Sequence, residues 1–215
     1  GELARTFDKM ADALEQRARE HEEANHNLLN RALQQTVVAA LGQFALVTND
    51  LASLLSQATV LVAQTLETEY CNVQECAKSR NSLRLVAGVG WRNGCIGQDH
   101  LIGDESTQDG FALSTGEPVV VADLPTEQRF RANPLLRDHG VKRGIAVVIS
   151  TRGVPFGRLG VHTARKREFT GDEIHFMLSV ASELGMAVER LQAEAQLSKL
   201  ATFARLNPNP ALELS

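Results

Sequence analysis

Three cysteines, Cys71, Cys76 and Cys95, are the residues that could support thiol chemistry. A reductase centre needs a reactive thiolate with a resolving thiol close by. Cys71 and Cys76 are five residues apart in a predicted strand, so their side chains point to opposite faces; each is also well suited to be a small buried hydrophobe. Cys95, in a glycine-rich stretch, is the one candidate for redox or enzymatic chemistry. An odd number of cysteines without a CxxC pair indicates a reducing compartment and no disulfide framework.

The six histidines form no comparable centre. His21 and His26, for example, are five residues apart and do not share a helix face. A haem or iron site assembled from distant residues stays open, although nothing in the sequence favours one. Neither a phosphate-cradling GxxxxGK loop nor a catalytic triad motif occurs. We therefore expect no metal, no resident cofactor and no turnover in this segment.

One predicted strand carries the residues best suited to hold a small molecule. Alternation places Leu159 and Val161 on one face of the sheet, and Arg158, Gly160 and His162 on the other. The apolar face should meet the helices, which leaves Arg158 and His162 facing a pocket. The alternatives are a solvated charge at Arg158 and a hydrogen-bonded buried imidazole at His162.

The walls of this pocket should come from loops and short helices. We expect Trp91 and Phe111 to roof it, with the segment 135–139 beside them. Gly160 and Gly144 should leave space, and a concave apolar site with few polar groups is the usual form of a small-molecule site. The alternative for Trp91 is plain core filling.

Long helices must position these elements at both ends of the chain. Residues 1 to about 67 lack proline, and the pattern predicts one helix ending near Val47 and a second beginning near Leu51 after an N-cap at residues 48–50. The last helix begins with the capping box Thr170 to Glu173 and runs to about residue 206, a length of ~50 Å at 1.5 Å per residue.

Both terminal helices carry apolar residues at alternating spacings of three and four, which is the seam of a coiled coil. We expect these seams to hold a parallel homodimer, with the seam histidine His21 facing its symmetry mate. The alternative is that each helix packs on its own domain. The seam residues are Leu3, Phe7, Met10, Leu14 and His21 in the first helix, and Met177, Leu184, Val188 and Leu191 in the last.

The middle of the chain predicts five strands and two short helices, which gives an α+β fold with an antiparallel sheet. The predicted strands cover 70–77, 83–89, 118–122, 142–150 and 156–163, and the short helices 107–115 and 134–139. At 43% hydrophobic the chain can build a core, and its net charge of −4 offers no footprint for nucleic acid. We find no bilayer-crossing run and no signal peptide.

Several motifs, loose individually but specific in their order, resemble a bacterial GAF domain over residues 40–192. They are EPVVVADL at 117–124, Arg129-Phe130, LLRDHGV at 135–141, PFGRLGVH at 155–162, FTGDEI at 169–174 and Glu189-Arg190. Residues 2–14 are similar to the second helix of a HAMP linker, and residues 206–213 to the entry of a PAS domain.

The resemblance implies a GAF fold, with a central antiparallel sheet, long N- and C-terminal helices on one face and short helices and loops over a pocket on the other. It divides the chain into the end of a HAMP-like coil (1–27), the GAF domain (28–192), a signalling helix (193–206) and a linker into a PAS-like module (207–215). It implies the cytoplasmic portion of an inner-membrane receptor, from a two-component sensor kinase or a cyclase, without membrane insertion of this segment.

The resembling families also supply patterns that this chain lacks. A bilin is held there by a cysteine just before the helix at Leu135, but residues 129–133 read RFRAN. Phe169, Asp172 and Glu173 look like part of a cyclic-nucleotide motif, yet no Asn-Lys pair accompanies them and helix capping explains them better.

We therefore expect a non-catalytic, dimeric sensory module that relays signals through its helices and binds a small molecule. Two alternatives stay open. The first is a redox-active or enzymatic domain that uses Cys95, and the second is a spacer that dimerises around a vestigial pocket.

Overall fold

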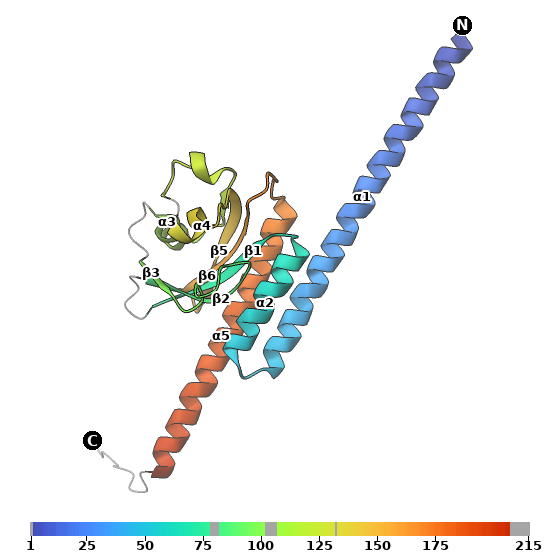
Figure 1. Ribbon diagram of the computed structural model, residues 1–215. Helices are drawn as coiled ribbons and strands as arrows, with labels where there is room; N and C mark the ends of the chain where they lie inside the picture. Colours follow the sequence, from blue (N-terminus) through green and yellow to red (C-terminus); the bar gives the residue numbers. More distant parts are fainter. Residues whose placement is uncertain (1, 78–81, 102–106, 132, 207–215) are drawn as a thin grey trace.

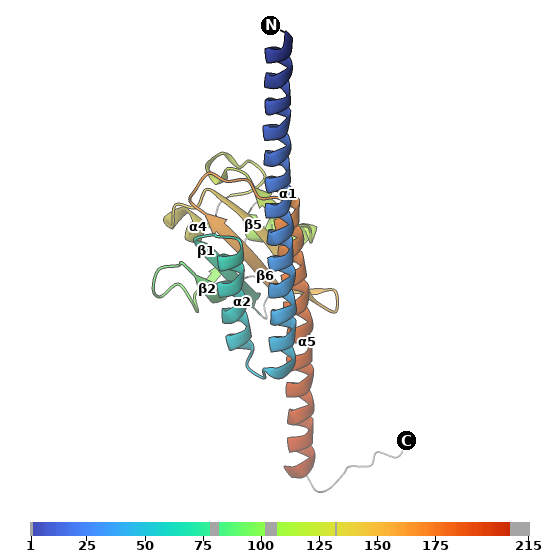
Figure 2. The same cartoon turned by 90° about the vertical axis from the view of Figure 1, so that its right-hand side faces the viewer.

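Three long helices cover one face of an antiparallel sheet in the computed structural model, which describes residues 2–77, 82–101, 107–131 and 133–206 (Figure 1). Helix α1 (Glu2–Val47) and helix α5 (Gly171–Leu206) run in the same direction side by side, and α2 (Leu51–Thr65) runs in the opposite direction (Figures 1 and 2). Both α2 and α5 pack directly on the sheet, and α1 packs on the outer side of these two helices. None of the described helices is long and apolar enough to cross a bilayer.

The helix boundaries agree with the capping signals in the sequence. The Asp50 carboxylate accepts the Ala52 N–H at 3.0 Å, which starts α2 after the predicted break. At the start of α5 the Glu173 N–H donates to Thr170 Oγ1, and the Thr170 N–H donates to the Glu173 carboxylate at 2.8 Å. This reciprocal pair is the capping box that the sequence predicts.

The described residues form six strands in one sheet, in the order β3-β2-β1-β6-β5-β4, and neighbouring strands are antiparallel. Strand β3 lies in the glycine-rich stretch and is not predicted from the sequence, because it is too short to show alternation. A bidentate ion pair between Arg84 and Asp99 connects it to β2. The strands are β1 (Tyr70–Cys76), β2 (Ser82–Val89), β3 (Asp99–Leu101), β4 (Val119–Val121), β5 (Arg143–Thr151) and β6 (Val154–Thr163).

A two-residue turn joins β5 to β6. Arg152 and Gly153 both have positive φ, at 50° and 76°. Left-handed conformations at both central positions match the twist of the flanking strands, so this hairpin has a well-defined register.

Short helices cover part of the other sheet face. Helix α3 (Gln108–Thr115) is capped by Thr107, and α4 (Pro134–Asp138) is capped by Asn133, with a 3₁₀ turn η1 (Leu124–Thr126) between them. The sequence pattern predicts both helices but not η1, because residues 124–133 are polar and loop-like. A second, smaller core around Val121, Phe130 and Leu136 packs beneath these helices.

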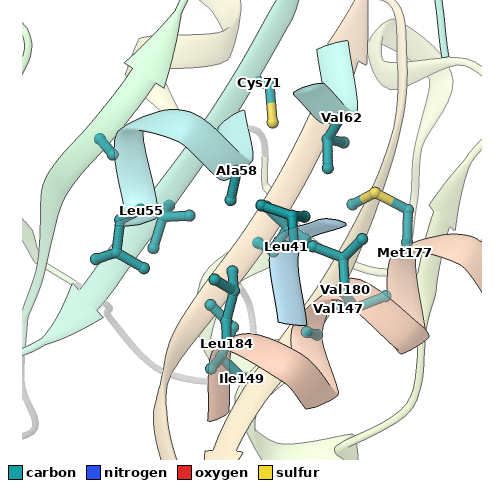
Figure 3. Close-up of a cluster of buried hydrophobic side chains, with 14 of the residues drawn as sticks. Leu41, Leu55, Ala58, Val62, Cys71, Val147, Ile149, Met177, Val180 and Leu184 are labelled. Atoms are coloured by element: carbon teal, nitrogen blue, oxygen red, sulfur yellow. The ribbon is translucent and has the colours of Figure 1, made fainter. Parts of the chain in front are cut away.

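The main core lies between the helices and the sheet (Figure 3). Met177, Leu184 and Val188 are 0–1% exposed and belong to this core, so their prediction as dimer contacts is wrong. A spacing of three and four marks a buried helix stripe, but it does not distinguish a partner helix from the domain's own sheet. Leu191, one turn further on, is half-buried.

The seam of α1 has a different environment. Met10 and Leu14 are 61% and 65% exposed, and His21 is exposed with its ring near the Asn25 amide at 3.2 Å. The side chains of Leu3 and Phe7 lie outside the described residues, as does the predicted PAS-like linker at 207–215. The coil around this seam therefore stays a prediction.

Two residues on α5 test this division of the helix into a buried and an open stripe. Leu184→Ala should lower the free energy of unfolding by about 2–5 kcal/mol, because it leaves a cavity in the main core. Met186→Ala, at a position 56% exposed, should change it by about 0.5 kcal/mol or less. Urea denaturation measures both, and equal losses would contradict the assignment of Leu184 to the core.

Candidate functional site

A row of polar residues crosses the sheet on the face opposite the long helices. Strand pairing sets Tyr70 beside His162, Asn72 beside Gly160 and Gln74 beside Arg158. Leu159 and Val161, between them on β6, belong to the main core under the helices. The predicted alternation along β6 is thus observed.

His162 lies flat on the sheet. A Cβ atom on Gly160 would stand 2.7 Å from His162 Nε2, and one on Gly144 would overlap Nδ1. The two glycines therefore make room for the imidazole, and the prediction that they leave free space is wrong. Burial, reinforced by the nearby Arg158 charge, lowers the pKa of His162 to about 3, which keeps the ring neutral.

Arg158 is 1% exposed, so it is not a solvated charge. Its Nε and Nη2 groups donate to Gln74 Oε1 at 3.1 and 2.7 Å. This contact orients the guanidinium along the sheet and occupies the acceptor oxygen of Gln74.

Trp91 covers the same region from the loop after β2. Its ring lies 4.9 Å from that of Tyr70 and 5.9 Å from that of His162, and its Nε1–H donates to the Cys71 carbonyl at 2.7 Å. Phe111 instead packs on Phe130, with ring centroids 5.5 Å apart. The structure thus brings Trp91 and His162 together, and both Trp91 and Phe111 pack against the smaller core.

Three buried amides were not anticipated from the sequence. Asn72, Gln74 and Gln108 are each at most 1% exposed. Asn72 and Gln74 are polar residues inside a predominantly buried strand, a signal that was available; Gln108 lies one helical turn before the buried Ala112. With His162 they hold six polar atoms that lack a partner, and each would cost about 1–3 kcal/mol if left so.

A second unpredicted feature fastens the Trp91 loop to α4. His139 Nδ1–H donates to the Leu135 carbonyl at 2.7 Å, and its Nε2 accepts the Arg92 N–H at 3.1 Å. The Tyr70 hydroxyl donates to the His139 carbonyl. His139 therefore holds the loop, the short helix and β1 together at one edge of the polar row.

None of the three thiols forms a disulfide, and their environments differ. Cys71 lies in the main core, where burial raises the pKa of its thiol. Cys95 is half-buried in a turn, where its backbone N–H donates to the Arg92 carbonyl at 3.2 Å. In the part of the chain that the structure describes, no three His, Cys, Asp or Glu side chains converge as metal ligands.

Surface grooves also lie on the helical side. One of about 560 Å³ runs between α1 and α5, where its walls include Val38, Ala39 and Phe176. A smaller one of about 210 Å³ follows it along the same two helices, with Leu46 and Met186 in its walls. These grooves are open hollows between helices rather than enclosed pockets.

Comparison with known proteins identifies the fold. The model of the GAF domain family matches residues 50–188. The GAF domain of a phosphoenolpyruvate-protein phosphotransferase from Coxiella burnetii superposes with a TM-score of 0.69 at 18% identity, over 78% of this chain and 99% of that one. No curated protein matches the sequence.

Two further structures have the same fold at similarly low identity. Free methionine-R-sulfoxide reductase from Neisseria meningitidis superposes with a TM-score of 0.65 at 16% identity, covering 77% of this chain and 93% of that one. A methyl-accepting chemotaxis protein fragment superposes with a TM-score of 0.63 at 16% identity, covering 71% and 97%. Identities this low relate the folds and not the activities.

The buried neutral His162 predicts acid sensitivity. The unfolded chain takes up a proton below the ordinary pKa near 6.5, whereas the folded chain does so only near 3. The resulting stability is complete above pH 6.5 and is lost as the pH falls towards 3. Between pH 7 and 5, urea unfolding should show a loss about 2 kcal/mol larger for the native chain than for His162→Gln. Parallel pH profiles for the two proteins would contradict this.

The thiol environments predict an order of reactivity. The half-buried Cys95 and Cys76 should react quickly with an aromatic disulfide reagent, and Cys95→Ser together with Cys76→Ser should remove that fast phase. Cys71 should react only after urea is added, because it is fully buried. A mass shift at Cys95 under peroxide would support the redox alternative, and fast labelling of Cys71 in the folded protein would refute its assignment to the core.

Proposed function

The chain belongs to the GAF domain family, and on that premise we propose that it is a non-catalytic regulatory module that relays conformational changes from α1 to α5 in a bacterial signalling protein. The GAF domain is a sensory and signalling module type. The observation that carries this proposal is the fastening of α5 to α1 at both ends of their contact.

Two arginines make these connections. Near the start of α5, Asp172 pairs with Arg31 of α1 at 2.6 Å. Towards the other end, Arg190 Nη2 donates to the carbonyls of Ala45 and Thr48 at 2.8 and 2.5 Å, where α1 ends. Because the helices are parallel and joined twice, a rotation or shift of α1 is passed directly to α5.

The arginine contacts also complete the helix ends. Neither α1 nor α2 has a basic residue in its last turn, so their final carbonyls depend on outside donors. Arg190 serves α1. Arg167, which pairs with Glu173 of α5, donates to the Leu66 carbonyl at the end of α2. Charge-assisted donors suit these negative helix ends, and both come from α5 or the segment that leads into it.

Both terminal helices extend beyond the domain in opposite directions (Figure 1). Leu197, Leu200 and Phe203 near the end of α5 are each 66% exposed, and Met10 and Leu14 are similarly open on α1. Apolar stripes on isolated helices require partners. In our proposal the partner is a second copy, in a parallel homodimer with His21 facing its mate.

The surroundings of the module are proposed from the sequence resemblance. A HAMP-like helix would precede it and a PAS-like module would follow it, in the cytoplasmic portion of a receptor of the sensor-kinase type. Within the domain, the dimer face would be the open side of α1 and α5 around Leu46 and Met186, since the inner stripe of α5 is occupied by the core.

A small molecule bound on the polar sheet face would be the input from within the domain. Trp91, Phe111, Arg158 and His162 are its proposed contacts, and no resident cofactor or metal is required. Such a ligand acts only if it binds two helix arrangements with different affinities. The His139 connection between the loop, α4 and β1 gives it a physical route to the sheet.

The relay can be tested by turning α1 and reading α5. We would fuse a parallel leucine zipper ahead of Leu14 with zero to four inserted alanines, in a chain with Cys76→Ser, Cys95→Ser and Leu200→Cys. Disulfide yield at position 200 should vary with the number of insertions and recover at about 3.6 residues, one helical turn. A disulfide yield that does not change with the number of insertions would contradict the proposed relay.

A matched pair of arginine variants locates the connection. Arg190→Met should make the disulfide yield at position 200 less dependent on the number of inserted alanines, because it removes the contact between α5 and the end of α1. Arg152→Met should retain the dependence, because Arg152 pairs with Glu189 of α5 rather than with α1.

The proposed dimer face has its own test. Met186→Glu should weaken the dimer at tens of micromolar in light scattering, whereas Ile96→Glu, at a residue equally exposed on a loop far from the helices, should leave the mass unchanged. A native chain that is monomeric under these conditions would contradict the homodimer.

A further inference from the structure

Helices α1 and α5 pack against each other in one constant register. Arg31 pairs with Asp172, which lies 141 residues further along the chain. Gly42 faces Glu183 at the same separation, and a Cβ atom on Gly42 would stand 3.0 Å from the Glu183 carboxylate. Arg190 donates to the Thr48 carbonyl at a separation of 142 residues. The two parallel helices therefore stay in step over about five turns, as the helices of a coiled coil do.

This register continues the seam of α1. The seam alternates spacings of four and three from Leu3 through His21 to Leu28. Counted onward from Leu28, the same alternation gives Arg31, Gln35, Val38, Gly42 and Ala45. On α5 the alternation that contains Asp172 and Glu183 also gives Phe176, Ser179, Met186 and Arg190. We call these positions of the two helices the shared register.

The shared register borders the two open grooves between α1 and α5. Val38 and Phe176 lie in the walls of the larger groove, and Gly42 and Met186 in those of the smaller one. Every other position of the shared register also lines one of these grooves. In a bundle of parallel helices such positions point toward the common axis. The grooves therefore lie on the side where a second α1–α5 pair fits.

The composition of the register changes where α5 leaves α1. Beside the domain it includes Glu183 and Arg190, and each would face an identical charge if two α5 helices paired directly there. Past Arg190 the alternation gives Ala193, Leu197 and Leu200, and the two leucines are each 66% exposed. Apolar residues at these spacings form the core of a parallel two-stranded coil.

We propose that the projecting end of α5 docks on the same helix of a second copy through Ala193, Leu197 and Leu200, in the register that joins α5 to α1. This deepens the proposed function, on which it rests, by assigning the dimer contact to one helix face. In this dimer α1 pairs with α1 up to Leu28, four helices meet beside the domain, and α5 pairs with α5 beyond Arg190. The unbroken alternation keeps the incoming and outgoing coils in one phase.

The competing face of α5 is the continuation of its buried stripe. Beyond Leu191 that stripe leads to Ala195 and Thr202, which are exposed. Each lies two residues from Leu197 or Leu200, a rotation of about 200° around the helix at ~100° per residue. The two faces therefore point in nearly opposite directions, and only one of them can form the dimer contact.

Single cysteines distinguish the two faces. In the full chain with the two serine substitutions used for the insertion experiment, we would compare Leu197→Cys and Leu200→Cys with the matched controls Ala195→Cys and Thr202→Cys. Cys71 stays fully buried. Under mild oxidation, crosslinking at 197 and 200 should be at least tenfold faster, because only core positions bring paired Cα atoms within the roughly 4.4–6.8 Å that a disulfide spans. Equal or faster crosslinking of the controls would overturn the proposed register.

A charge placed on either face provides a second measurement. Leu197→Glu should raise the dissociation constant of the dimer at least tenfold in analytical ultracentrifugation, because it places two like charges in the core of the coil. Ala195→Glu should leave the constant unchanged. Both positions are exposed on the projecting helix, so neither variant should disturb the folded domain. Equal dissociation constants for the two variants would contradict the proposal.

The results also separate this proposal from the proposed function. A dimer that crosslinks through Ala195→Cys and Thr202→Cys would refute the register and leave the homodimer intact. A native chain that stays monomeric would refute the homodimer itself, and the docking of α5 with it.

Discussion

The packing of α5 on β5 is the contact on which the other elements depend. Gly185 allows it, because a Cβ atom there would overlap the Ser150 carbonyl. The close approach buries Met177, Leu184 and Val188 in the main core and fixes the height of α5 above the sheet. The remaining helices are placed relative to α5, since α1 packs along it and the ends of α1 and α2 are completed by arginines from α5 and the segment before it.

The two faces of the sheet consequently differ in the side chains that they carry. Under the helices the side chains are aliphatic, the packing is continuous and the contacts are stabilising. On the other face the strands carry amides, an arginine and a histidine in a buried row, with aromatic rings at its edge. A protein selected only for stability would fill this face with apolar groups, because unpartnered polar atoms weaken a fold. This asymmetry is the physical reason why the proposed ligand is assigned to the polar face and the proposed relay to the helices.

Local signals in the sequence predicted most of the fold, and long-range pairings account for the rest. Asp50 and Thr170 act within three residues, so the helix starts could be found from the chain alone. The surface against which an apolar helix face packs could not be predicted, because the spacing around Leu184 is the same whether the helix packs on a sheet or on a partner helix. In the site, alternation placed His162 correctly, but the role of Gly160 and the position of Asn72 beside it depend on strand register.

The arginine that completes α1 has a consequence for synthesis. Arg190 and Thr48 are separated by 142 residues, so the ribosome has made nearly the whole domain before the end of α1 can be capped. Contacts this distant in sequence close late in folding. Until α5 emerges, the apolar sides of α1, α2 and the first strands remain uncovered, and nascent chains that stall before residue 190 would be candidates for chaperone binding. Completion of the last helix is thus the step that covers these apolar sides and caps the end of α1.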